Sequence, residues 1–104
     1  MIRHVVMWRV RGDRPADRNA ARERVREALE GLRGRISGMT RLEIGLDQSA
    51  VDYACDVVLV TEFISQGALT AYAVHPEHQR VRAELGDLRT ERYQVDYAVP
   101  IGEN

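Results

Sequence analysis

The chain has 104 residues, 44% of them hydrophobic and 30% charged, a composition typical of one soluble globular domain. Its net charge of −1 excludes the strongly basic surface expected of a nucleic-acid-binding domain or of a protein held on an anionic membrane. No apolar stretch is long enough to span a bilayer, and the N-terminus lacks the pattern of a signal peptide. We therefore expect a cytoplasmic protein with no nucleic-acid partner and no membrane partner.

The first half of the chain alternates between strand and helix patterns. Apolar and polar residues alternate over 2–11, which predicts a strand. Apolar residues then recur three and four positions apart as far as residue 36, which predicts an amphipathic helix that begins near Pro15. Residues 39–46 alternate again, and the β-branched run at 57–60 indicates a strand covered on both faces.

The second half adds two helices and a strand. A helical pattern starts near Ser65, and His75-Pro76 interrupts it because a residue before proline avoids the α region. A new helix should begin at Pro76, and residues 90–99 form the last strand. The order predicts an α+β fold, a ferredoxin-like four-stranded antiparallel sheet with helices on one face, in a single domain over residues 1–104.

The predicted strands carry apolar side chains on both faces. The second-face residues are Val5, Met7, Val58, Val60, Tyr93, Val95, Tyr97 and Val99. Because no helix is left to cover this face, we expect two copies to pack sheet against sheet as a homodimer, a dimeric α+β barrel.

The segment His75-Pro76-Glu77-His78 is the most informative for chemistry. In a helix that begins at Pro76, His78 shares a stripe with Val81 and Leu85, so it should point inward at the sheet. Tyr72 lies on the apolar stripe of the preceding helix and should also point inward. Together they offer a base near neutral pH and a hydroxyl donor.

His4 and Asp96 are expected to pair across strands. The first and last strands of a ferredoxin-like sheet are antiparallel neighbours, so the start of one lies beside the end of the other. Structural alternatives stay open: His75 as a helix cap, His4–Asp96 as a buried pair that fixes the strand register, and Tyr72 as a core residue. Three histidines and an acid could also ligate a metal, but their spacing is not that of a zinc motif, and we expect none.

Five segments resemble the stress-responsive A/B barrel (Dabb) family over nearly the whole chain. They are Ile2-Arg3-His4-Val5-Val6, Ile36-Ser37-Gly38-Met39 with Leu42-Glu43-Ile44-Gly45, Asp56-Val57-Val58-Leu59-Val60-Thr61-Glu62-Phe63, Ala71-Tyr72-Ala73-Val74-His75-Pro76-Glu77-His78, and Val95-Asp96-Tyr97. The His-Pro-x-His segment is the most specific of them. The resemblance implies a dimeric α+β barrel. The proteins that the chain resembles include a plant polyketide cyclase that works without metal or organic cofactor.

The resemblance also implies roles for individual residues. His78 would take a proton from an acidic carbon, and Tyr72 would stabilise the resulting enolate or oxyanion. Asp96 would hold or polarise His4, which completes a catalytic set that needs no cofactor. The residues expected to line the ligand are Val6, Trp8, Leu59, Thr61, His75, Arg92 and Gln94.

The predicted function is therefore a homodimer that binds a small organic, polyketide-like molecule between sheet and helices and acts as a cofactor-free cyclase or lyase. Arg92 and Gln94 on the pocket face favour a more polar or carboxylated ligand than a hydrocarbon tail. Two alternatives stay open, a non-catalytic stress-response or assembly protein and a cofactor-independent monooxygenase of the same fold.

Overall fold

The computed structural model describes residues 1–100, so residues 101–104 of the predicted domain lie outside the described residues. The order of strands and helices is the predicted one. The elements are β1 (Ile2–Val10), α1 (Pro15–Glu30), β2 (Met39–Leu46), β3 (Val57–Phe63), α2 (Gln66–Ala73), α3 (Pro76–Leu85) and β4 (Arg89–Ala98).

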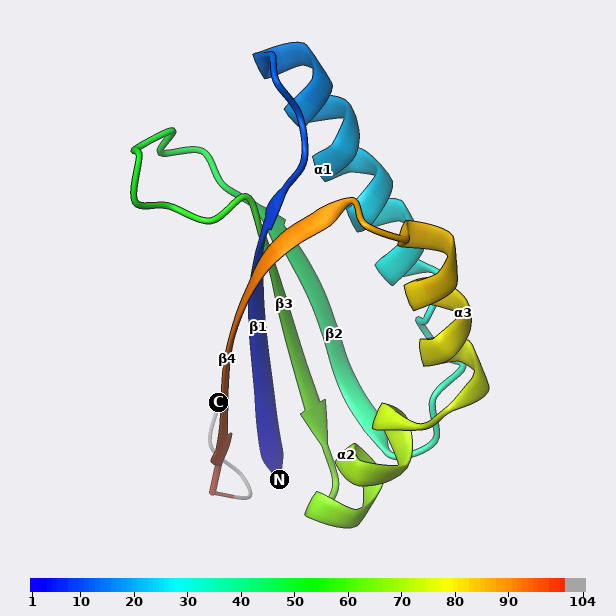
Figure 1. The fold of residues 1–104 in the computed structure, drawn as a ribbon. Helices are drawn as coiled ribbons and strands as arrows, with labels where there is room; N and C mark the ends of the chain where they lie inside the picture. The colour runs from blue at the N-terminus through cyan, green and yellow to red at the C-terminus, as the bar shows by residue number, and fades with distance from the viewer. Residues whose placement is uncertain (101–104) are drawn as a thin grey trace.

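The four strands form one antiparallel sheet in the order β2-β3-β1-β4. The three helices lie on one face of this sheet, as Figure 1 shows. This arrangement confirms the predicted ferredoxin-like fold. Within residues 1–100, no helix is both long and apolar enough to cross a membrane.

The core lies between the sheet and the helices. Val6 on β1 and Leu59 on β3 lie on the inward face of the two central strands and are at most 2% exposed. They pack against the apolar stripe of α1, where Val25 and Leu29 are equally buried. Within residues 1–100, β4 is an edge strand whose one neighbour in the sheet is β1. The space between β4 and the helices holds the site described below.

The first helix is shorter than the apolar stripe predicted. It ends at Glu30, and the chain continues through turns with hydrogen bonds three residues apart. Glycine has a low helix propensity, and Gly34 takes the left-handed conformation at φ +75°. Leu32 and Ile36 are nevertheless buried. The stripe therefore predicted burial correctly but helix length incorrectly.

The face of the sheet away from the helices is apolar and open, as predicted. The large side chains exposed on it are Met7, Tyr93, Val95 and Tyr97. The prediction for Val99 was wrong, because this residue follows the end of β4 and is buried, at 8% exposed.

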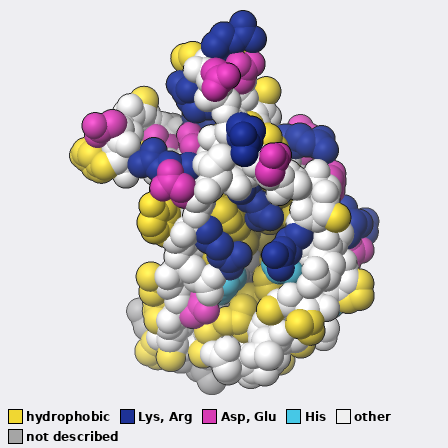
Figure 2. All heavy atoms as spheres, viewed as in Figure 1, with side chains coloured by type: hydrophobic (Ala, Val, Ile, Leu, Met, Phe, Trp, Pro, Cys, Tyr) yellow, Lys and Arg dark blue, Asp and Glu magenta, His cyan; other side chains and the backbone are white. Residues whose placement is uncertain are grey.

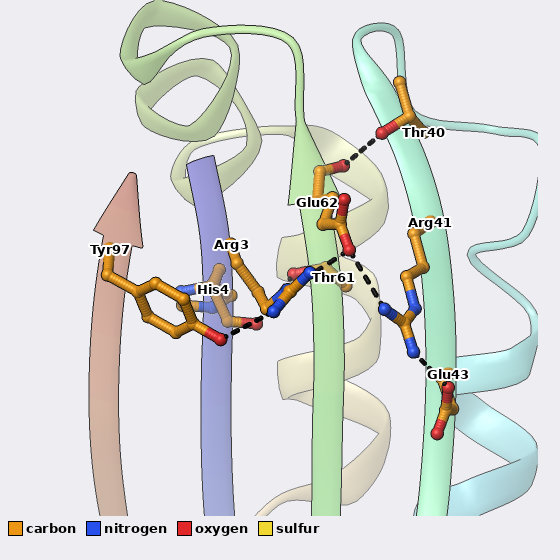
Figure 3. A network of polar contacts seen from close by, with 8 residues as sticks. All are labelled: Arg3, His4, Thr40, Arg41, Glu43, Thr61, Glu62 and Tyr97. Atoms are coloured by element: carbon orange, nitrogen blue, oxygen red, sulfur yellow. Dashed lines mark hydrogen bonds and ion pairs between the residues drawn. The ribbon is translucent and has the colours of Figure 1, made fainter. Parts of the chain in front are cut away.

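The charged groups at one end of this face are paired within the chain (Figure 3). Glu62 accepts hydrogen bonds from Arg3 at 3.2 Å and from Arg41 at 3.0 Å, and Arg41 also donates to Glu43 at 2.7 Å. Arg3 donates to the Tyr97 hydroxyl at 2.8 Å. Because these charges are already satisfied, the face could be buried without leaving them unpaired.

Candidate functional site

The junction between α2 and α3 is built by two helix caps. The Ser65 side chain accepts a hydrogen bond from the Ala68 N–H at the start of α2. His75 Nδ1 accepts from the Glu77 N–H at 3.0 Å, at the start of α3. The sequence expectation that His75 caps a helix is thus confirmed. The same contact corrects its expected place among the ligand-lining residues, because the ring faces the helix end and lines neither cavity described below.

Tyr72 and His78 meet on the inner side of this junction. Their ring centroids are 4.7 Å apart with 66° between the planes. Tyr72 also packs on Phe63 at 5.3 Å and is 3% exposed. Burial raises the pKa of Tyr72 to about 12, although the charges of Arg89 and Arg92 oppose the shift. At neutral pH the Tyr72 hydroxyl is therefore a proton donor, and within residues 1–100 it has no hydrogen-bond partner.

His78 combines burial with an unused ring nitrogen. Its Nδ1 atom is buried and has no hydrogen-bond partner among the described residues. Burial lowers the pKa of His78 below its ordinary value of 6.5, and the positive charges of Arg82 and Arg92 add to this effect, while a contact of the ring with the Ala73 backbone opposes it. At neutral pH the ring is therefore uncharged, which is the form that can accept a proton.

His4 is fixed in place by β4. His4 and Asp96 are register partners, and His4 Nδ1 lies 2.6 Å from Asp96 Oδ1, which confirms the predicted pairing. The other carboxylate oxygen accepts from Gln94 at 3.0 Å, and the Gln94 amide oxygen accepts from Arg92 at 2.5 Å. Thr61 donates its hydroxyl to the His4 carbonyl at 3.2 Å. The His4 ring centroid lies 6.3 Å from that of Tyr72.

These side chains share a cleft of about 270 Å³ between β4 and the two short helices. Its lining comprises His4, Gln66, Leu69, Thr70, Tyr72, Ala73, His78, Arg92, Gln94 and Asp96. All four predicted catalytic residues thus reach one cleft, together with the predicted ligand-lining residues Arg92 and Gln94.

A smaller cavity of about 20 Å³ lies deeper, with room for roughly one water molecule. Three predicted ligand-lining residues, Val6, Trp8 and Leu59, face this cavity rather than the open cleft. Thr61 lines neither space, since it is fully buried and its hydroxyl is used on His4. The strand pattern placed Thr61 on the correct face but could not indicate its depth.

Two arginines of the site were not predicted. Arg82 and Arg89 line the small cavity, and both also line a wider groove of about 550 Å³ between α3 and β4. Figure 2 shows basic side chains on two sides of the hollow in this face, with histidine side chains beneath them. Arg82 could have been found from the sequence, because it lies four positions after His78 and so on the same side of α3.

The arrangement can accept a proton at His78 and donate a hydrogen bond from Tyr72 to an oxygen nearby. Within residues 1–100, no cluster of three or more His, Cys, Asp or Glu side chains could hold a metal ion. The molecule is thus a ferredoxin-like α+β protein whose cleft brings together a neutral imidazole and a phenol. Residues 2–99 match the stress responsive A/B barrel domain (Dabb), and the chain belongs to this family.

Solved structures share this fold across the whole chain. A dimeric protein of unknown function with a ferredoxin-like fold from Bacteroides fragilis is 28% identical, with a TM-score of 0.81 over 94% of this chain and 95% of that one. A Dabb family protein from Mesorhizobium loti is 26% identical, with a TM-score of 0.74 over 97% of each chain.

A hydroxynitrile lyase from Passiflora edulis is similar in fold alone, at 12% identity and a TM-score of 0.76 over 99% of this chain and 96% of that one. No curated protein matches the sequence.

Proposed function

We propose that this protein is an acid–base enzyme, a cyclase or lyase, that uses its own side chains on a small organic, polyketide-like molecule held in the cleft. The observation that carries the proposal is the buried, unpartnered Nδ1 of His78 beside the protonated hydroxyl of Tyr72. Buried polar atoms are usually hydrogen-bonded, so the unpartnered Nδ1 of His78 is better explained by a ligand than by folding.

The proposed reaction starts with a proton on a carbon next to a carbonyl group. His78 takes this proton, and the electron pair of the broken C–H bond moves onto the carbonyl oxygen as an enolate. Tyr72 donates a hydrogen bond to that oxygen, which stabilises the charge as it develops. In a cyclase, the enolate carbon then attacks a second carbonyl of the same molecule, and His78 returns the proton to the alkoxide formed. In a lyase, the enolate electron pair forms a C=C bond to the neighbouring carbon, the group on that carbon leaves with its bonding pair, and His78 returns the proton to the leaving group.

His4 and Asp96 have a supporting part in this proposal. The carboxylate holds the His4 ring by one nitrogen, so the ring keeps one orientation at the cleft. The Passiflora edulis protein shows that this fold can host a lyase, although its low identity says nothing about these residues. The unpartnered Nδ1 of His78 argues against a purely structural assembly protein, whereas a cofactor-independent oxygenase would use a base at this place as well.

Exchange of carbon-bound protons tests the proposal without knowledge of the substrate. Acetophenone in D₂O at neutral pD loses its methyl proton signal when a base forms the enolate, and NMR follows this loss. We expect the wild-type protein to accelerate the exchange and His78→Ala to abolish the acceleration. Arg80→Ala, on the exposed side of the same helix, should retain it. An exchange rate equal to that of buffer, or a folded His78→Ala variant as active as wild type, would overturn the catalytic proposal.

We also propose that the active form is a homodimer whose two sheets pack through the open apolar face. The exposed side chains of Met7, Tyr93, Val95 and Tyr97 support it, because a surface of this kind is unfavourable in water. The Bacteroides fragilis protein of the same fold is described as dimeric, which agrees with this assembly.

A further inference from the structure

Within residues 1–100, three arginines differ from the other twelve because they have neither a carboxylate nor a backbone carbonyl as a partner. Nine of the fifteen form ion pairs with carboxylates. Three more, Arg18, Arg22 and Arg24, donate to backbone carbonyls. Among residues 1–100, only Arg82, Arg89 and Arg92 have neither kind of partner, and all three line the groove between α3 and β4.

The three side chains approach the groove from both of its sides. Arg82 comes from the last turn of α3, while Arg89 and Arg92 come from β4. The Arg89 guanidinium lies over the Trp8 ring, 4.9 Å from its centroid, and Arg92 donates to Gln94. Arg92 lines both this groove and the cleft of His78 and Tyr72, so its side chain borders both spaces.

Nearby acids do not neutralise the cluster. Asp96 is used by His4 and Gln94, and Glu91 forms an ion pair with Arg9 at 3.5 Å. Burial lowers the pKa of Arg89, and the charges of Arg92 and Arg82 lower it further. Three guanidinium groups held together without a counter-ion repel one another, and an anion between them would relieve this repulsion. Their forked donors match the oxygens of a carboxylate or a phosphate.

We propose that Arg82, Arg89 and Arg92 form an anion subsite, and that the ligand carries a carboxylate or phosphate group there while its reacting carbon lies beside His78 and Tyr72. The placement of the reacting carbon rests on the proposed function, whereas the subsite itself does not. The subsite makes the substrate class an organic acid or phosphate ester with a carbonyl group, rather than an uncharged molecule.

Three aryl ketones of similar shape test the subsite: 4-acetylbenzoate, 4-acetylphenyl phosphate and the uncharged 4-acetylbenzamide. Isothermal titration calorimetry in a phosphate-free buffer gives the three dissociation constants. We expect at least one anionic probe to bind about tenfold or more tightly than the amide, the effect of one charge-assisted hydrogen-bonded pair. The tighter of the two anions indicates whether the natural group is a carboxylate or a phosphate.

Substitutions then localise the preference. Arg82→Gln and Arg92→Gln should each reduce it severalfold, while Arg80→Gln makes the same change of net charge outside the groove and should leave it intact. Arg89→Lys keeps the positive charge and a long side chain over Trp8, so it tests whether the forked donor geometry of the guanidinium group is needed. Equal affinity for all three probes, no binding of either anion at millimolar concentration, or an equal loss in Arg80→Gln would overturn the subsite.

The outcomes separate the two proposals. A preference for anions that depends on Arg82 and Arg92, without proton exchange that depends on His78, would retain the subsite and reject the enzyme. Proton exchange on acetophenone that depends on His78, with no preference for anions, would retain the enzyme and reject the subsite.

Discussion

The contact between Tyr72 and His78, with ring centroids 4.7 Å apart, depends on a break between two helices. Tyr72 lies in the last turn of α2, and His78 lies in the first turn of α3. In one continuous helix, residues six positions apart point to different sides. The extended conformation of His75 before Pro76 turns the second helix so that both rings face the same cleft. The His-Pro-x-His segment therefore orients the two helices at the cleft as well as supplying His78.

The Tyr72 hydroxyl should matter for catalysis and little for stability. Tyr72→Phe keeps the ring contacts with His78 and Phe63 but removes a hydroxyl that has no partner among the described residues. We expect urea denaturation to show a loss of less than about 1 kcal/mol, and acetophenone exchange to fall by about 10²-fold. A loss of several kcal/mol with unchanged exchange would show that the hydroxyl is structural.

The lowered pKa of His78 predicts how stability depends on pH. Its pKa lies below 6.5 in the folded protein because of burial and the nearby arginines, so the unfolded chain binds this proton more readily. Stability should therefore be highest above about pH 6.5 and fall as the pH decreases towards the folded-state pKa. His78→Gln removes this contribution, so its stability should fall less than that of wild type between about pH 8 and about pH 5. Identical slopes of stability against pH in urea denaturation would contradict the assignment, because the two proteins differ only at residue 78.

Strand alternation and proline position predicted most of the fold. The alternating residues of β2 gave its bounds, and Pro76 gave the start of α3, because these signals come from local backbone chemistry. The His4–Asp96 contact followed from topology, since antiparallel neighbours with a known order bring one strand start to the other strand end. The end of α1 did not follow, because the apolar stripe continues through turns where the helix does not.

Arg89 shows why part of the site was not predictable. Alternation counted back from Arg92 puts Thr90 on the cleft side and Arg89 on the open face. The structure pairs Arg9 with Glu91 but Val10 with Arg89, so the register shifts by one residue. This irregularity moves Arg89 to the side of Trp8. A one-residue shift in register moves a side chain to the opposite face of the sheet, and the local sequence does not predict such a shift.

Removing the carboxylate of Asp96 should destabilise the protein by isolating a buried histidine. His4 is 5% exposed, and its Nδ1 contact is with Asp96. We expect Asp96→Ala to cost about 1–3 kcal/mol in urea denaturation. Glu91→Ala is the matched control on the same strand, because its contact with Arg9 is exposed and should contribute about 0–1 kcal/mol. Equal effects of the two variants would mean that the His4 pair contributes no more than a surface ion pair.

A charge in the middle of the open face should separate the proposed dimer. Val95 is 61% exposed there and pairs in register with Val5 on the central strand β1. In a face-to-face dimer, Val95→Arg would place two unpaired guanidinium groups in an apolar interface, at a cost of several kcal/mol. We expect sedimentation velocity to show a dimer for wild type and a monomer for Val95→Arg. Val74 is 73% exposed at the end of α2, so Val74→Arg makes the same substitution on the helix side and should remain dimeric. A wild-type monomer would exclude the assembly, and a dimer that tolerates Val95→Arg would place the interface elsewhere.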